Sequence, residues 1–189
     1  MSLTARTSRD VLHVFQDHLN KTLNRTLTRY RLRFFLRSTK SDHASLAFFN
    51  NRGVAIAVPL PPTPWHLSIN YELQAVPEGK EHGLKILEYK HRLHRTSSID
   101  DEAEVRFEYV SPDIDPDFPY SRHHVQFHRD ARSASSDDFS LSKLHIPTGC
   151  VTIEHVIRFL IADLDVPPLT EQWEAELQAS EERSREWRG

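Results

Sequence analysis

Hydrophobic residues near the start of the chain recur every fourth position, which predicts a helix over residues 8–26. The apolar positions are Val11, Phe15, Leu19 and Leu23, and this spacing places them on one helical face. The residues just before them, from Thr7 to Asp10, have a spacing close to that of a capping box. We therefore expect a first helix that buries one face.

A second helical pattern occupies residues 152–164, where apolar residues follow i, i+3, i+4 and i+7 spacing. Thr152 is a suitable N-terminal cap, and Pro167 with Pro168 ends the helix. A last helix is predicted to begin near Thr170. Its charged end, about residues 178–189, is expected to fray because it offers few apolar contacts.

Between these helices, apolar and polar residues alternate in short segments, which is typical of half-buried strands. The clearest segment is WHLSINYELQ, residues 65–74, in which every second residue is apolar. The cluster from Asn50 to Gly53 lies between two apolar segments, 45–50 and 53–60, and predicts a hairpin. The other predicted strands are 29–37, 85–95, 104–110, 122–129 and 143–146.

Consecutive strands without intervening helices indicate an antiparallel sheet, one face of which can stay polar. The pattern predicts an α+β fold with a single antiparallel meander of about seven strands. The N- and C-terminal helices should pack on one face, and the other face should be polar. A chain of 189 residues is expected to form a single domain, 1–189.

Composition narrows the protein class. The single cysteine, Cys150, excludes an intramolecular disulfide and a cysteine-based zinc cluster. No apolar run approaches the ~20 residues that cross a bilayer, and the first residues lack the apolar core of a signal peptide, so we expect a cytoplasmic protein without membrane contact. The net charge of -3 does not suit a non-specific nucleic-acid binder.

The stretch YSRHHVQFHRDA, residues 120–131, concentrates three histidines. Val125 and Phe127 are two positions apart, which is strand spacing and fits no helical stripe. In a strand, His124 and His128 lie roughly 13 Å apart, too far to share one zinc ion. We expect no metal and no cofactor, since 5 glycines also leave no phosphate-binding loop or dinucleotide fingerprint. A metal would need a cross-strand triad of His94, His124 and His145.

Strand alternation gathers polar residues of neighbouring strands on the face that points away from the helices. Histidine can exchange protons near physiological pH, and arginine binds phosphate or carboxylate. The candidate catalytic residues are His124, His94 and His145. The candidate ligand-binding residues on this face are Arg106, Arg122, Gln126, His128, Lys90 and Arg92. A structural interpretation is also open, because cross-strand pairs of opposite charge stabilise a solvent-facing sheet. It explains the charged residues better than the histidines.

The ordered segments RFEY, SRHHVQFH, LHIPTG and TIEHVIRFLIADL resemble the C-terminal half of small prokaryotic proteins. More distantly, they are similar to the TumE-type toxins of toxin–antitoxin pairs, in which a tyrosine strand precedes a histidine-rich strand and a helix. The resemblance covers about residues 104–165 and implies a toxin-like function. The matching positions are Arg106, Tyr109, His124, Gln126, His128 and His145, which adds Tyr109 to the candidate ligand-binding residues.

Two functional hypotheses of different class follow for the polar face. The first is metal-independent cleavage of RNA, with His124 and either His94 or His145 as acid and base and with Arg106 and Arg122 stabilising the phosphate charge. The second is a non-catalytic interaction module that binds an anionic small molecule or a protein partner, which could be a cognate one. Both hypotheses place a phosphate-bearing or acidic ligand on the same face.

Overall fold

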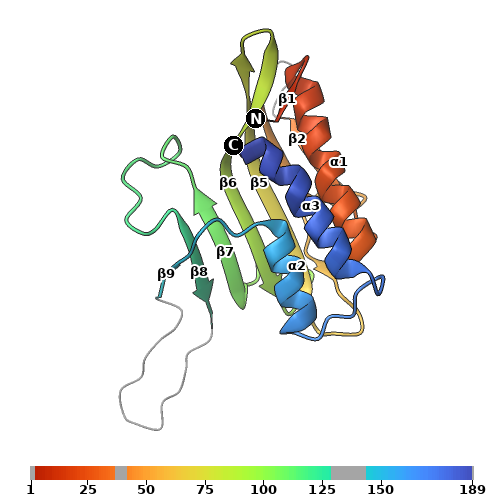
Figure 1. The fold of residues 1–189 in the computed structure, drawn as a ribbon. Helices are drawn as coiled ribbons and strands as arrows, with labels where there is room; N and C mark the ends of the chain where they lie inside the picture. Colours follow the sequence, from red (N-terminus) through yellow and green to blue (C-terminus); the bar gives the residue numbers. More distant parts are fainter. Residues whose placement is uncertain (1–2, 37–41, 129–143, 189) are drawn as a thin grey trace.

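A large antiparallel sheet is covered on one face by helices (Figure 1). The computed structural model describes residues 3–36, 42–128 and 144–188. The main sheet has the order β2-β3-β5-β6-β7-β8-β9, so neighbours in the chain pair as a meander. Its strands are β2 (Leu32–Leu36), β3 (His43–Phe48), β5 (His66–Glu78), β6 (Glu81–His94), β7 (Val105–Val110), β8 (His123–Phe127) and β9 (Ile146–Pro147).

Two short strands extend this sheet: β1 (Thr4–Ala5) pairs with β6, and β4 (Val58–Pro59) pairs with β5. The long hairpin of β5 and β6 is the centre of the sheet. Its strands are joined at Gly79, which has a φ of 63°, a conformation that glycine adopts without steric cost. The alternation predicted for β5 is confirmed, because its apolar residues are buried beneath the helices: Leu67, Ile69, Tyr71 and Leu73.

The helices are α1 (Ser8–Thr26), α2 (Ile153–Ala162) and α3 (Trp173–Arg188). The bounds predicted for the first helix are confirmed, and the Thr7 side chain accepts a hydrogen bond from the Asp10 amide at 3.1 Å. α1 packs on β5 and β6, while α3 contacts α1 and α2 (Figure 1). The predicted α+β class, with a meander sheet and terminal helices on one face, is confirmed.

The structure corrects one local expectation. The predicted hairpin across Asn50–Gly53 does not form, because β3 already pairs with β2 on one side and β5 on the other. Within the described residues, the two segments are linked across that turn by a single antiparallel bridge between Phe49 and Ala55, with backbone hydrogen bonds from Asn50 to Val54 and from Ile56 to Phe48. The charged end is helical through Arg188, and its Ser180 side chain is buried against the other helices. That this end frays stays a prediction.

Candidate functional site

The polar face carries most of the predicted site residues in the expected register. Lys90 pairs with Glu108 and Glu108 with His124, whereas Arg92 pairs with Arg106 and Arg106 with Gln126. Residues that pair across adjacent strands point to the same face of the sheet. The strands therefore present these side chains together on the face away from the helices.

His124 and His145 lie side by side on this face, with ring centroids 4.9 Å apart. Tyr120 stacks on His145 at 3.6 Å, and the His124 Nε2 atom lies 3.8 Å from a Glu108 carboxylate oxygen. Burial, and then the neighbouring His124, lower the pKa of His145. The His124 side chain is itself buried, and from the connection between β7 and β8 Phe118 packs on His124 while Tyr120 packs on His145.

His94 is not part of this pair. It lies two strands and four residues away from His124 in the register, which corresponds to roughly 16 Å. Its Nδ1 atom is 3.2 Å from the Asp101 carbonyl oxygen and its Nε2 atom is 2.9 Å from the Ser68 hydroxyl. Because a carbonyl only accepts, Nδ1 carries the hydrogen and Nε2 accepts from Ser68. The separation excludes both an acid–base pair of His94 with His124 and the metal triad with His145.

The cationic side chains predicted for the site are engaged by neighbouring oxygen atoms. The pairs are Lys90 with Glu88 (2.7 Å), Arg92 with Glu108 (2.6 Å), Arg106 with Glu102 (3.3 Å) and His128 with Glu102 (2.8 Å). Arg122 donates to the carbonyl oxygens of Asp115 and, at 2.8 Å, of Pro116. A phosphate on this face would have to displace these partners or share the cations with them.

Two further features do not fit the predicted anion-binding site: the lining of a hollow beside Arg92, His94 and Arg106, and the position of Tyr109. Arg92, His94 and Arg106 border a hollow of about 290 Å³, but three carboxylates line it as well: Asp100, Asp101 and Glu102. That lining disfavours an anionic ligand there. Tyr109 faces the helices rather than the polar face, because it pairs with Tyr89 and stacks on His123 at 4.5 Å. The position added by the toxin resemblance is therefore on the opposite side of the sheet from Arg106.

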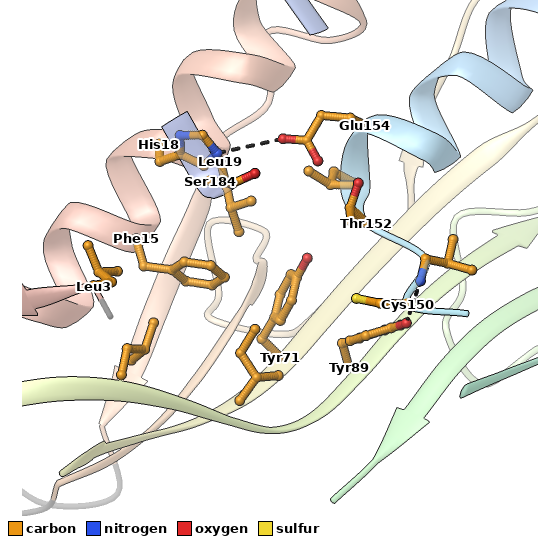
Figure 2. A pocket seen from close by; sticks show the side chains of 14 residues that line it. Leu3, Phe15, His18, Leu19, Tyr71, Tyr89, Cys150, Thr152, Glu154 and Ser184 are labelled. Carbon is orange, nitrogen blue, oxygen red and sulfur yellow. Dashed lines mark hydrogen bonds and ion pairs between the residues drawn. The ribbon is translucent and has the colours of Figure 1, made fainter. Parts of the chain in front are cut away.

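The helix-covered face contains a cavity that sequence reasoning missed (Figure 2). Its volume is about 130 Å³, and it lies between α1, the start of α2, the end of α3 and the central strands. Its apolar wall is formed by Leu3, Phe15, Leu19, Leu84, Ile86, Val151 and Ile153. Its polar groups come from His18, Tyr71, Tyr89, Thr152, Glu154 and Ser184, and the exposed Cys150 lies beside them.

A buried carboxylate joins the three helices at this cavity. Glu154 of α2 accepts a hydrogen bond from the Ser180 hydroxyl of α3 at 2.5 Å and lies 3.6 Å from Nε2 of His18 on α1. Ser180 also contacts the Thr22 hydroxyl at 2.7 Å. Burial alone would raise the pKa of Glu154, but hydrogen bonds from His18, Ser180 and Thr152 lower it to about 2. The carboxylate is therefore charged inside the protein.

Serine, histidine and glutamate suggest a nucleophilic triad, but their geometry does not match one. A triad requires the carboxylate and the serine on different ring nitrogens of the histidine. Here Ser180 and Glu154 approach the same Nε2 atom, at 3.2 Å and 3.6 Å. Ser180 is also fully buried and does not line the cavity. The network holds the helices together and supplies a charged wall.

The floor of the cavity contains a tyrosine backed by a buried histidine. The Tyr71 hydroxyl points into the cavity (Figure 2) and lies 2.9 Å from Nε2 of His91. His91 stacks on Tyr89 at 4.8 Å, and burial lowers its pKa to about 3. Within the described residues its Nδ1 atom has no hydrogen-bond partner. Since buried N–H groups are rarely orphaned, Nε2 carries the hydrogen and donates it to Tyr71.

The sequence contained weak signals for this cavity. His91 falls between Tyr89 and Leu93 in strand alternation, so a polar residue occupies an apolar-face position. Glu154 lies in the first turn of a strongly apolar helix, beside the stripe that begins at Ile153. Each is a polar residue on a face that should be buried. The periodicity of apolar residues alone, however, does not predict that α3 packs against α1 and contacts His18.

Comparisons with known proteins identify no relative. No protein-family model matches the chain, and neither a curated protein nor a solved structure is significantly similar to it. The resemblance to TumE-type toxins therefore stays a prediction. Over residues 3–36, 42–128 and 144–188, no helix is long and apolar enough to span a membrane. In the same ranges no three histidine, cysteine or acidic side chains are grouped to hold a metal ion.

Proposed function

We propose that this protein binds a small, largely apolar molecule in the cavity between its helices and its sheet. The observation that carries the proposal is the composition of the cavity wall. One side is aliphatic and aromatic, and the other presents the Tyr71 and Thr152 hydroxyls and the charged Glu154. Small-molecule sites combine an apolar lining with a few fixed polar groups in this way.

The volume of the cavity limits the size of the ligand. Its 130 Å³ is close to that of an engineered apolar cavity of roughly 150 Å³ that admits benzene. A single substituted ring or a short branched chain fits this volume. The ligand should carry one neutral or cationic polar group, because a second anion beside Glu154 would be repelled.

Binding is favoured over catalysis by the state of the polar groups. Glu154 is held charged, whereas a general acid or base at neutral pH needs a pKa near the working pH. His91 is neutral and lies behind Tyr71, so it orients the hydroxyl rather than meeting the ligand. These groups can recognise a ligand without exchanging protons with it.

A cavity-filling substitution tests the proposal. Toluene and p-cresol would be titrated into wild type and Ile86→Phe, with binding followed by calorimetry and by the shift in melting temperature. Ile161→Phe is the matched control, because Ile161 is similarly half-buried but does not line the cavity. We expect binding to wild type and to Ile161→Phe, and its loss in Ile86→Phe. Equal binding to all three proteins, or none to wild type, would contradict the proposal.

The polar wall can be tested separately. A ligand hydroxyl in contact with Tyr71 should make p-cresol bind about fivefold more tightly than toluene, the size of one hydrogen bond. Tyr71→Phe should remove that preference while leaving toluene affinity unchanged. A preference that survives in Tyr71→Phe would mean that the hydroxyl does not take part.

A second candidate function is binding of a phosphate-bearing ligand, most plausibly RNA, at His124 and His145. A stronger version of this hypothesis adds metal-independent cleavage of the bound RNA. It is supported by the adjacent imidazoles, 4.9 Å apart, which could act as a base and an acid on one phosphate. Their cover by Phe118 and Tyr120 would have to open. Labelled RNA titrated at several salt concentrations tests it: binding should weaken with salt, and His124→Ala should abolish cleavage but keep affinity.

A further inference from the structure

The two edges of the sheet differ in how far they are closed to another strand. At one edge β9 has only the residues Ile146 and Pro147, and proline has no N–H to donate. At the other edge β2 has five residues, LRFFL, none of which is proline. Among the described strands β2 pairs with β3 alone. An edge of this kind is a template for a further strand.

The backbone of β2 points its hydrogen-bonding groups outward at alternate residues. The Leu32 amide donates to the Asn20 side chain at 2.7 Å, and the Leu32 carbonyl accepts from Gln16 at 2.8 Å and from Asn20 at 3.1 Å. These groups therefore face α1 and not β3. Because the direction alternates along a strand, the N–H and C=O of Phe34 point outward too.

A groove lies beside the β2 edge of the sheet. Between β2 and α1 there is a hollow of about 220 Å³, lined by Arg9, Leu12, His13, Gln16 and Phe34. His13 contacts the Phe34 ring edge-on at 5.8 Å, which fixes one wall. A strand edge beside a helix, with space between them, is the arrangement in which extended peptides add to a sheet.

The charged side chains beside the groove and along β2 are positive, and they have no partner among the described residues. Arg9, Arg31 and Arg33 are exposed, and none of their side chains has an ion pair or a hydrogen bond with a described residue. The α1 carboxylates Asp10 and Asp17 do not line the groove. By strand alternation Arg31 and Arg33 lie on the polar face of β2, opposite Phe34, whereas Arg9 lines the groove. Next to the arginines, the Phe35 side chain is 60% exposed.

We propose that the β2–α1 groove is a docking site for an extended acidic segment of a partner protein, which adds to the sheet as a strand beside β2. Acidic side chains on the polar face would meet Arg31 and Arg33, and the alternate apolar side chains would enter the groove beside Phe34. A second copy of the chain fits less well, since pairing β2 with β2 would bring arginines of both copies together. RNA would meet the charges but could not pair with the strand backbone. The site is independent of the cavity.

A defined peptide tests the docking site. The probe is a fluorescein-labelled ten-residue peptide in which glutamate alternates with valine, titrated into the full chain and followed by anisotropy. One control peptide replaces glutamate with lysine, and another replaces valine with proline, which keeps the charge but cannot pair. We expect binding of the first peptide only, with affinity that falls as salt is added.

Charge-reversal variants locate the site. Arg33→Glu should weaken binding of the glutamate–valine peptide by at least about tenfold. Arg52→Glu is the matched control, because Arg52 is exposed in the turn of residues 50–53 and should leave binding unchanged. Hydrogen exchange gives a readout independent of the variants: the Phe34 amide should become protected when the peptide binds.

Several results would overturn the docking site. They are equal loss of binding in Arg52→Glu, equal binding of the proline peptide, no protection of Phe34, or no binding at millimolar peptide. Displacement of the peptide by single-stranded RNA with higher affinity would assign the groove to nucleic acid instead. A dimer in sedimentation analysis that Arg33→Glu dissociates would assign it to self-association.

Discussion

The two faces of the sheet use polar residues in opposite ways. On the polar face, which is the open face of the sheet, charges are numerous, but they lie in cross-strand pairs such as Arg92 with Glu108. On the covered face polar groups are few, yet Glu154 and Tyr71 border a cavity and are held in fixed positions by His18 and His91. The stretch that is richest in reactive residue types therefore does not coincide with the cavity, where a few polar groups are held in fixed positions.

The largest effect should come from a charge placed on the covered face. Leu160 of α2 is fully buried in the core, so Leu160→Asp should lower the free energy of unfolding by about 4 kcal/mol or more. Asn70→Asp on the open face of β5 should change it by less than about 0.5 kcal/mol. Urea denaturation measures both. Similar losses for the two variants would mean that the faces do not differ in burial.

The next largest effect should come from lowering the pH, which destabilises the covered face through the buried side chain of His91. Burial lowers its pKa from the ordinary 6.5 to about 3, so the unfolded chain takes up this proton at a higher pH than the folded protein. The contribution of His91 to the free energy of unfolding is therefore highest above pH 6.5, where its side chain is neutral in both states, and it falls as the pH decreases below 6.5. Between pH 6.5 and 5 the loss should be up to about 2 kcal/mol.

A variant isolates the contribution of His91. The pKa values of His94, His123 and His145 are also lowered, mainly by burial, and add to the same trend. His91→Phe should remove only its own part, whereas Tyr71→Phe, which keeps the buried imidazole, should retain it. Unfolding measured across this pH range is the readout. An unchanged slope in His91→Phe would show that this histidine is not buried and neutral.

A smaller effect is expected for the pairs on the open face. Arg92→Ala removes the two hydrogen bonds to Glu108, but the pair is partly solvated, and the cost should be about 0.5–1 kcal/mol. The loss should shrink in high salt. A cost as large as that of Leu160→Asp would indicate a buried ionic network and would remove the contrast between the faces.

The smallest effect should be that of added zinc. Because His94 is remote from His124 and His145, the part of the open face that the structure describes offers no cluster of three histidines. Stoichiometric zinc should shift the melting temperature of the untagged chain by less than about 1 °C. A larger stabilisation that His145→Ala abolishes would mean that another residue completes a metal site there.

Patterns of period two and period four were enough to predict the architecture. Val11 to Leu23 defined the first helix, and the alternation around Tyr71 defined the central strand and its buried face. The same rule correctly placed His124 and Arg106 on one face. These features follow from local geometry, which each segment carries in its own sequence.

Contacts between distant segments were not predictable in this way. Ser180 has a polar side chain in a charged helix, and only the approach of α1 and α2 buries it. Likewise His124 lies on the solvent side of its strand, and only the loop with Phe118 covers it. The cavity and the cover of the histidines both depend on which segments meet, and periodicity does not encode that.

The cavity also constrains the order in which the protein can become functional. Its walls include Leu3 on one side and Ser184 on the other, so residues near both ends of this chain must be in place before it closes. During synthesis α1 and the central strands emerge first and leave their apolar surfaces uncovered until α3 follows. A ligand of the proposed kind would therefore bind only after α3 has packed against α1 and closed the cavity wall at Ser184.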